Sequence, residues 1–226
     1  MSQTFFITGS GTGVGKTLVT AALAYQLRKA GTGVSALKPV VSGYAPSDME
    51  SDTAIILQSL GQAVNPVTIA AVSPWKFSAP LASNIAAAAE GKKIVFSEVV
   101  DFCNVTRTSD ITLIEAAGGA MSPLTDTHTM LDLAVALQCP VILVVGTYLG
   151  AISHALTAGE VLKARGIPVQ AVIVSESETS AIDALGTAGE FKKFFPGAKH
   201  IVPLPRIGGG GERLWEHAAD LTWVLS

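Results

Sequence analysis

A glycine-rich segment near the N-terminus constrains this chain more than any other feature. Residues 9–17 read Gly-Ser-Gly-Thr-Gly-Val-Gly-Lys-Thr and follow a short β-branched and aromatic run at 4–8. Apolar residues with helical spacing come next, over 18–29. A loop of this kind turns successive backbone N–H groups toward one point, and the positive end of the following helix faces the same point. The segment therefore predicts a binding site for phosphate.

Two residues at the end of this segment extend the prediction to a nucleoside triphosphate with magnesium. Lys16 can reach the β- and γ-phosphates, and the Thr17 hydroxyl can coordinate Mg²⁺. The usual spacing of such loops places a glycine at position 10, where this chain has Ser10 between Gly9 and Gly11. We interpret the segment as a variant phosphate-binding loop. A glycine-rich turn without a ligand is the alternative.

Strand and helix patterns alternate along the rest of the chain. Helices between strands indicate βαβ units, a parallel sheet and right-handed crossovers. We expect an α/β fold in one domain over residues 1–226, doubly wound, with a mainly parallel sheet and helices on both faces. Strands are predicted at 4–8, 34–38, 111–115, 140–145, 169–174 and 200–202. Helices are predicted at 18–29, 51–60, 81–90, 97–107, 129–137, 152–165 and 181–194. We expect a loop with at most one short strand over 62–79, and a flexible joint at 208–211 before a final short helix.

Composition narrows the classes of function. The formal net charge is −3 and the pI is about 5.8, so the chain has no basic footprint for nucleic acid. The apolar run at 141–145 is too short to span a bilayer. No charged run followed by a long apolar stretch opens the sequence, so we expect no signal peptide. We expect a cytoplasmic protein without a membrane partner. Cys103 and Cys139 match no zinc spacing and are expected to be buried, inert thiols.

Two charged residues end otherwise apolar strands. In open parallel sheets, ligands bind beyond the carboxyl ends of the strands. Lys38 ends the second predicted strand, and Glu115 ends the third. Lys38 can stabilise the negative charge that develops when a γ-phosphoryl group is transferred. Glu115 can hold magnesium, directly or through water. A solvated strand end is the alternative for each.

Other polar residues allow two interpretations. Asp52 follows Ser51 at a helix start, so it is either a metal ligand or part of an N-cap. Ser42 either binds a substrate or belongs to a turn. The Pro-Leu-Pro-Arg segment at 203–206 either supports a nucleotide base or is an ordinary proline-rich loop. His154 is interpreted as a packed or surface histidine rather than a catalytic one.

Taken together, these segments resemble the dethiobiotin synthetase family, the ATP-dependent cyclising ligases of biotin synthesis. The phosphate loop alone is shared by many ATPases, but its combination with the segments that follow Lys38 and Glu115 is far more specific. The matching segments are TGSGTGVGKT at 8–17, LKPVVSG at 37–43, SD at 51–52, IEAAGG at 114–119, SPLTDTHTMLDLA at 122–134, PVILVVGTYLGAISHAL at 140–156 and PLPRI at 203–207.

The resemblance implies a fold, a reaction and a partner. The fold would be a doubly wound domain like that of P-loop NTPases, and the protein would act as a homodimer. The substrates would be 7,8-diaminononanoate, CO₂ and ATP, with Mg²⁺, and the products would be dethiobiotin, ADP and phosphate. An amine would first trap CO₂ as a carbamate. ATP would then phosphorylate the carbamate, and the second amine would close the ring.

The resemblance also implies roles for individual residues. Lys16, Lys38, Thr12 and Ser42 would be catalytic, and Thr17, Asp52 and Glu115 would hold magnesium. Nucleotide contacts are expected from Gly13, Val14, Gly15, Lys16, Thr17, Leu18, Asp52, Glu115, Ala116, Ala117, Gly118, Ser175, Leu204, Pro205 and Arg206. Substrate contacts are expected from Thr12, Lys38, Ser42 and Gly118, and, at the substrate's carboxylate tail, from Leu149, Gly150, Ala151 and Ile152 across a subunit interface.

Three residues depart from the family pattern, and three other functions are weighed against it. Ala116 stands in place of a common glycine, and Ser153 in place of an asparagine. Ser175 replaces an asparagine that commonly reads adenine, which leaves the nucleotide preference open. The main alternative is a switch-type P-loop ATPase related to partitioning ATPases, although the second lysine typical of that group is absent from 8–12. A related ligase or kinase, and a nucleotide-binding module without turnover, are the others.

Overall fold

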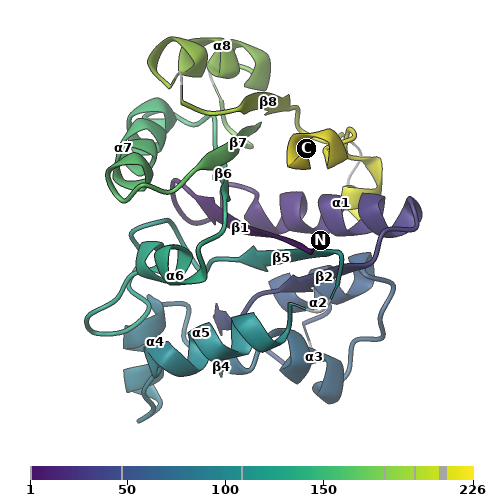
Figure 1. The fold of residues 1–226 in the computed structure, drawn as a ribbon, viewed down its shortest axis with the longest axis vertical. Coiled ribbons are helices and arrows are strands. Elements are labelled where there is room, and N and C mark those ends of the chain that lie inside the picture. The colour runs from purple at the N-terminus through teal and green to yellow at the C-terminus, as the bar shows by residue number, and fades with distance from the viewer. Residues whose placement is uncertain (1, 47, 108, 181, 196, 209–212) are drawn as a thin grey trace.

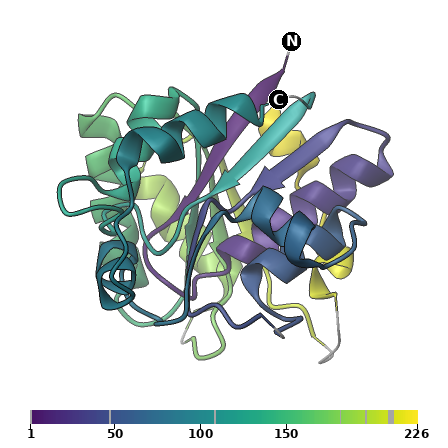
Figure 2. The same cartoon turned by 90° about the horizontal axis from the view of Figure 1, so that it is seen from below.

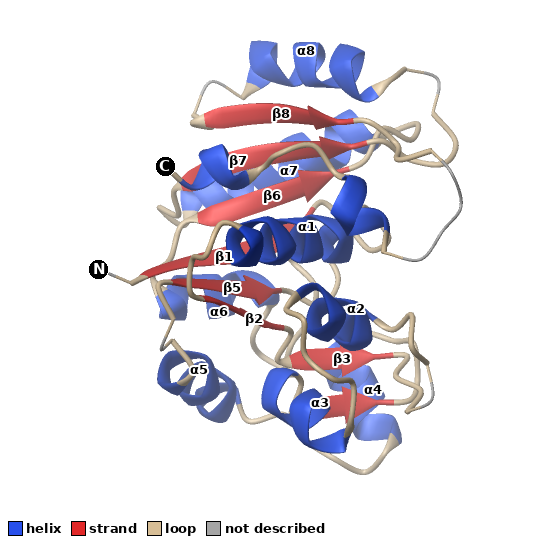
Figure 3. Ribbon diagram, turned by 90° about the vertical axis from the view of Figure 1, so that its right-hand side faces the viewer, coloured by secondary structure: helices blue, strands red, loops and turns tan. Residues whose placement is uncertain are grey.

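A six-stranded parallel sheet forms the centre of the molecule (Figure 1). The computed structural model describes residues 2–46, 48–107, 109–180, 182–195, 197–208 and 213–226. The strand order is β2-β5-β1-β6-β7-β8, and every neighbouring pair is parallel, as Figure 3 shows. This confirms the predicted α/β class. The strands are β1 (Gln3–Gly9), β2 (Val34–Leu37), β5 (Ile111–Glu115), β6 (Val141–Val145), β7 (Val169–Ser175) and β8 (His200–Leu204).

Helices cover both faces of this sheet (Figure 2). Alternate strand residues face opposite layers, so Phe6 and Ile114 join one apolar cluster while Ile7 and Leu113 join the other. Burial on both faces explains why the strands are apolar runs rather than alternating patterns. One face carries α1 (Lys16–Lys29), α2 (Asp52–Ser59), α3 (Pro66–Val72) and the 3₁₀ turns η1 (Leu214–His217) and η2 (Thr222–Leu225). The other carries α4 (Ser83–Ala89), α5 (Phe96–Val105), α6 (Met130–Leu137), α7 (Ala151–Ala164) and α8 (Ala184–Phe194).

The predicted loop over 62–79 is wrong, because this segment contains a helix as well as a strand. Asn65 caps α3 in a reciprocal capping box with Thr68, and Pro66 occupies the first turn. The helix has seven residues, of which Ile69 and Val72 are buried. A helix this short gives no sustained apolar periodicity, so its capping residues are the sequence signal that could have found it.

A second, two-stranded parallel sheet extends the fold beyond β2. It pairs β3 (Val40–Ser42) with β4 (Trp75–Phe77), and it continues as hydrogen bonds from Gly43 N–H to the Ala79 carbonyl and from Tyr44 N–H to the Phe77 carbonyl. Ser42 is therefore the last residue of a strand. The segment that follows β4 lies beside the segment that follows Ser42.

The C-terminal segment packs on α1. The predicted final helix is two short 3₁₀ turns, η1 and η2, and Trp215 of η1 is buried in the cluster that includes α1. The predicted flexible joint at 208–211 falls outside the described residues beyond Gly208. Among the helices described, none combines the length and apolar character needed to cross a membrane.

Both cysteines are free and buried, as the sequence predicts. Burial raises the pKa of Cys103 to about 12 and that of Cys139 to about 11, so neither thiol ionises near neutral pH. We expect the native protein to resist alkylation by iodoacetamide at pH 8, and both thiols to react after denaturation. Mass spectrometry of the alkylated protein checks this. Labelling of the native protein as fast as a free thiol would contradict the burial of these residues.

Candidate active site

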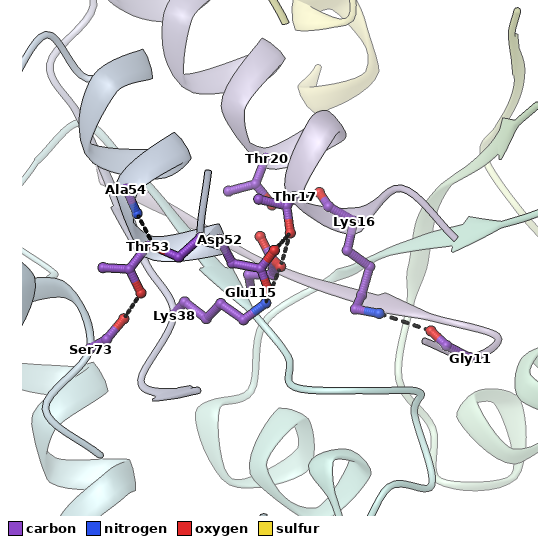
Figure 4. A network of polar contacts seen from close by, with 11 residues as sticks. Gly11, Lys16, Thr17, Thr20, Lys38, Asp52, Thr53, Ala54, Ser73 and Glu115 are labelled. Carbon is purple, nitrogen blue, oxygen red and sulfur yellow. Dashed lines mark hydrogen bonds and ion pairs between the residues drawn. The ribbon is translucent and has the colours of Figure 1, made fainter. Parts of the chain in front are cut away.

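The glycine-rich loop joins the end of β1 to the start of α1. Gly15 is the N-cap of α1 with φ of 93°, and Gly13 has φ of 72°. Both values lie in the left-handed region that favours glycine. Lys16 folds back over the loop, and its Nζ donates a hydrogen bond to the Gly11 carbonyl at 2.8 Å (Figure 4). The lysine is thus held against the backbone that would cradle a phosphate.

The ammonium group of Lys16 is nearly buried. Burial lowers its pKa to about 8, and the positive charge of Lys38 acts in the same direction, while Glu115 and Asp52 partly oppose this. A buried cation without a direct carboxylate partner is stabilised by an incoming anion. The phosphate loop therefore offers a preformed positive site.

Lys38 and Glu115 meet because of strand register. In the β2–β5 pair, Leu37 lies opposite Ile114, so the two following residues emerge at the same edge of the sheet. Lys38 Nζ donates a hydrogen bond to Glu115 Oε1 at 2.8 Å, and the exposed fractions of the two residues are 5% and 1%. The alternative of two solvated strand ends is therefore wrong.

Asp52 completes this charged cluster. The N-cap of α2 is Ser51, whose Oγ accepts from Ala54 N–H, so Asp52 does not cap the helix. It forms an ion pair with Lys38 instead. Burial disfavours charge on both groups, but their mutual attraction outweighs it. The negative charges of Glu115 and Asp52 raise the pKa of Lys38, and the positive charge of Lys38 lowers the pKa of Asp52.

The oxygen atoms of Thr17, Asp52 and Glu115 fit a magnesium ion. Thr17 Oγ1 lies 2.8 Å from Asp52 Oδ1 and 2.8 Å from Glu115 Oε1 (Figure 4). Glu115 Oε2 is buried and has no hydrogen-bond partner among the described residues. Hard oxygen donors of this kind suit Mg²⁺. No group of three or more His, Cys, Asp or Glu side chains gathers in the described part of the chain, so water and phosphate would supply the remaining ligands.

These residues surround a pocket of about 800 Å³. It includes eleven of the residues predicted from the sequence: Thr12, Gly13, Gly15, Lys16, Thr17, Leu18, Lys38, Ser42, Asp52, Ala117 and Gly118. Five further lining residues were not predicted: Pro80, Leu81, Ala82, Ser83 and Ser122. The first four follow β4 and reach the pocket because β4 pairs with β3. The sequence pattern predicts no strand at 40–42, so it gives no signal for this pairing.

The residues expected near the nucleotide base lie beside the phosphate loop but outside this pocket. Ser175 ends β7 opposite Leu204 of β8, and a Cβ added to Gly15 would lie 2.5 Å from Ser175 Oγ. Arg206 N–H donates to Glu176 Oε2 at 3.0 Å, which ties the segment after β8 to the end of β7. The strand ends thus bring the predicted base-contacting residues together.

Four of the predicted nucleotide contacts have buried apolar side chains. These are Val14, Ala116, Ala117 and Leu204, which belong to the apolar clusters, although Ala117 also lines the pocket. The predicted contacts of the other three would have to come from the backbone. Pro205, by contrast, is exposed beyond the end of β8.

The predicted contacts at 149–152 do not reach the pocket of the same chain. These residues form the turn into α7, with Gly150 as the N-cap, and Leu149 is fully exposed. None of them is among the residues that line the pocket. The expected contact through a partner subunit stays a prediction. His154 lies nearby on α7, with Nδ1 2.9 Å from the Tyr148 hydroxyl, as a surface histidine.

Solved structures with similar folds include a signal recognition particle receptor and a signal recognition particle protein. The signal recognition particle receptor FtsY of Elizabethkingia anophelis superposes with a TM-score of 0.55 at 16% identity, covering 100% of this chain and 64% of the receptor. The 54 kDa signal recognition particle protein of Aeropyrum pernix, in complex with GDP, superposes with a TM-score of 0.53 at 14% identity, covering 99% of this chain and 44% of that protein. These similarities support the fold alone.

Sequence relatives are much more similar. The AAA domain family AAA_26 matches residues 3–207. The ATP-dependent dethiobiotin synthetase BioD of Caulobacter vibrioides is 45% identical over 210 residues, covering 91% of this chain and 94% of the relative. The enzymes of the same name from Methylobacterium nodulans and Phenylobacterium zucineum are 47% identical (77% of this chain, 81% of the relative) and 41% identical (98% and 94%). With a P-loop fold and this degree of identity over most of its length, the chain belongs to the ATP-dependent dethiobiotin synthetase family.

Proposed function

We propose that this chain converts 7,8-diaminononanoate, CO₂ and ATP to dethiobiotin, ADP and phosphate with the help of Mg²⁺. The names of the relatives support ATP-dependent formation of dethiobiotin. The observation that carries the finer proposal is the position of Lys38, whose ammonium contacts Glu115 and Asp52 in a pocket that also contains the phosphate loop and Ser42. One buried cation thus borders both the nucleotide and the substrate regions.

The proposed reaction has three steps. One amine of the substrate adds to CO₂ and loses a proton, which gives a carbamate. A carbamate oxygen attacks the γ-phosphorus of ATP, and ADP leaves. The second amine then attacks the carbonyl carbon of this mixed anhydride and loses a proton, phosphate leaves and the ring closes. The carbamate, ATP and the mixed anhydride are all anionic, so Lys16 and Lys38 would hold the reactants together and stabilise the developing charge.

The remaining residues of the site would position the reactants. Thr17, Asp52 and Glu115 would hold Mg²⁺, which supplies charge neutralisation at the phosphates when it is bound. Thr12 and Ser42 border the same pocket as Lys38 and would meet the carbamate end of the substrate. The fully exposed Leu149 in the turn before α7 supports a homodimer in which this turn meets the substrate bound to the other subunit. We place the enzyme in the cytoplasm.

Phosphate release tests the proposed function directly. Purified protein would be incubated with Mg²⁺, ATP and bicarbonate, with and without 7,8-diaminononanoate. We expect phosphate release to require the diamine and dethiobiotin to appear in equal amount. Steady ATP hydrolysis that ignores the diamine would instead favour the switch-type ATPase, and the substrate roles of Lys38 and Ser42 would then be withdrawn. Omitting Mg²⁺ should abolish the formation of both phosphate and dethiobiotin.

A further inference from the structure

Ser122 closes a tight turn in the loop that follows β5, the strand that ends at Glu115. Gly119 N–H donates to Ser122 Oγ at 2.7 Å, and Ser122 N–H donates to the Gly119 carbonyl at 3.0 Å. Gly118 has φ of 75°, and a Cβ at that position would overlap Ser122 Oγ. The hydroxyl therefore lies against the backbone of Gly118 and at the same time fixes the next peptide N–H.

This turn packs against the phosphate loop. Ala120 N–H donates to the Gly9 carbonyl at 2.9 Å, and a Cβ added to Gly119 would lie only 3.2 Å from the Gly11 Cα. On the pocket side, a Cβ added to Gly118 would lie 3.8 Å from Thr12 Oγ1. The turn and the phosphate loop thus form one continuous wall, and the conformation of the turn sets how the Gly118 backbone faces Thr12.

The peptide unit between Gly118 and Gly119 has an unusual freedom. Neither residue has a Cβ, so both peptide orientations are sterically open to the chain alone, because glycine populates positive and negative φ about equally. A flip of this unit would exchange a carbonyl for an N–H along the wall. Within the described residues, the Ser122 hydroxyl is the acceptor that holds the Gly119 N–H.

We propose that Ser122 is a positioning residue for dethiobiotin formation, acting through the Gly118–Gly119 peptide on the substrate beside Thr12. Ser122 lines the same pocket as Thr12 and Gly118. This inference rests on the proposed function. Loss of the hydroxyl would leave the charged cluster in place and would let the wall change its orientation.

Three variants separate positioning from folding. We expect Ser122→Ala to lower kcat/KM for the diamine about 10- to 100-fold, because displacements of about 1 Å cost on this scale. Its Kd for Mg-ATP should stay within about threefold of the wild type, and Ser122→Thr, which keeps the hydroxyl, should recover most of the activity. The control is Ser59→Ala, which removes a buried hydroxyl that donates to the Ile56 carbonyl on α2, outside the pocket, and should keep wild-type kinetics.

Hydrogen exchange of the peptide that contains Gly119 provides a readout independent of turnover. The amide should be protected in the wild type and in Ser122→Thr, and should exchange faster in Ser122→Ala without a matching change elsewhere. Wild-type kinetics and protection in Ser122→Ala would overturn the inference, as would a Ser122→Thr variant no better than Ser122→Ala, or a loss of activity that only follows a loss of folded protein. Absence of dethiobiotin with the wild type would instead contradict the proposed function itself.

Discussion

Replacing Lys38 with alanine is expected to lower dethiobiotin formation by about 10²- to 10³-fold, the usual loss when one preorganised donor to a developing charge is removed. The ammonium contacts Glu115 Oε1 at 2.8 Å and Lys38 lines the pocket, whereas the phosphate loop is formed by other residues. Mg-ATP should therefore still bind with a Kd within about threefold of the wild type, a change far smaller than the kinetic one. Isothermal titration calorimetry and product assays on the same sample would show this separation.

A matched lysine outside the site controls for the lost charge. Lys76 on β4 donates to the Ser73 carbonyl and does not line the pocket, so Lys76→Ala should keep full activity. Equal rates of dethiobiotin formation in Lys38→Ala and the wild type would remove Lys38 from the mechanism. A parallel loss of ATP binding in Lys38→Ala would show that the variant disturbs the whole site.

The Lys38→Ala variant also tests whether Glu115 and Asp52 bind magnesium. Without Lys38, Glu115 and Asp52 face one another with no cation between them. Removing one partner of a buried ion pair lowers the free energy of unfolding, here by up to about 3 kcal/mol because Asp52 is partly exposed. Mg²⁺ bound by these carboxylates would restore part of that stability. Thermal unfolding should show a larger rise in Tm on adding MgCl₂ for Lys38→Ala than for the wild type. An equal rise in both proteins would argue against these two carboxylates as the metal site.

Replacing Lys16 with alanine is expected to damage binding and chemistry together. Its Nζ lies over the phosphate loop, 2.8 Å from the Gly11 carbonyl, and so would contact the phosphates in both the ground state and the transition state. We expect the Kd for Mg-ATP to rise about 100-fold, which corresponds to about 2.7 kcal/mol, and dethiobiotin formation to remain low even at saturating ATP. Calorimetry and steady-state kinetics at high ATP concentration measure the two effects.

Lys29 at the opposite end of α1 provides the comparison for Lys16. Its ammonium lies 5.7 Å from the centre of the Tyr25 ring on the surface, far along the helix from the loop. Lys29→Ala should leave both Kd and kcat unchanged. If Lys16→Ala recovered the wild-type rate at saturating ATP, Lys16 would contribute to nucleotide binding alone, and its proposed part in catalysis would fail.

Local patterns were sufficient where the chemistry depends on neighbouring residues. The phosphate loop is contiguous over 9–17, and glycine, lysine and threonine at those positions have one well-understood physical use. The six strands of the main sheet were also predicted at nearly their observed bounds, because strands buried on both faces are unbroken apolar runs. Lys38 and Glu115 could be selected for the same reason, since each charged residue directly follows such a run.

Tertiary structure decided what depends on residues far apart in the chain. Whether Asp52 caps a helix or faces Lys38 could not be settled from sequence, because both require the same residue at a helix start. The pairing of β3 with β4 brings the segment after β4 to the pocket. The strands β3 and β4 have three residues each and α3 has seven, so their sequence patterns are too short to predict them. Ser122 acts on a glycine turn whose significance depends on its contact with the phosphate loop. The sequence by itself determined the chemistry of the phosphate loop and of the strand ends. Only the register between strands and the packing of loops decided which other groups share the pocket, because contacts between distant segments leave no local periodicity in the sequence.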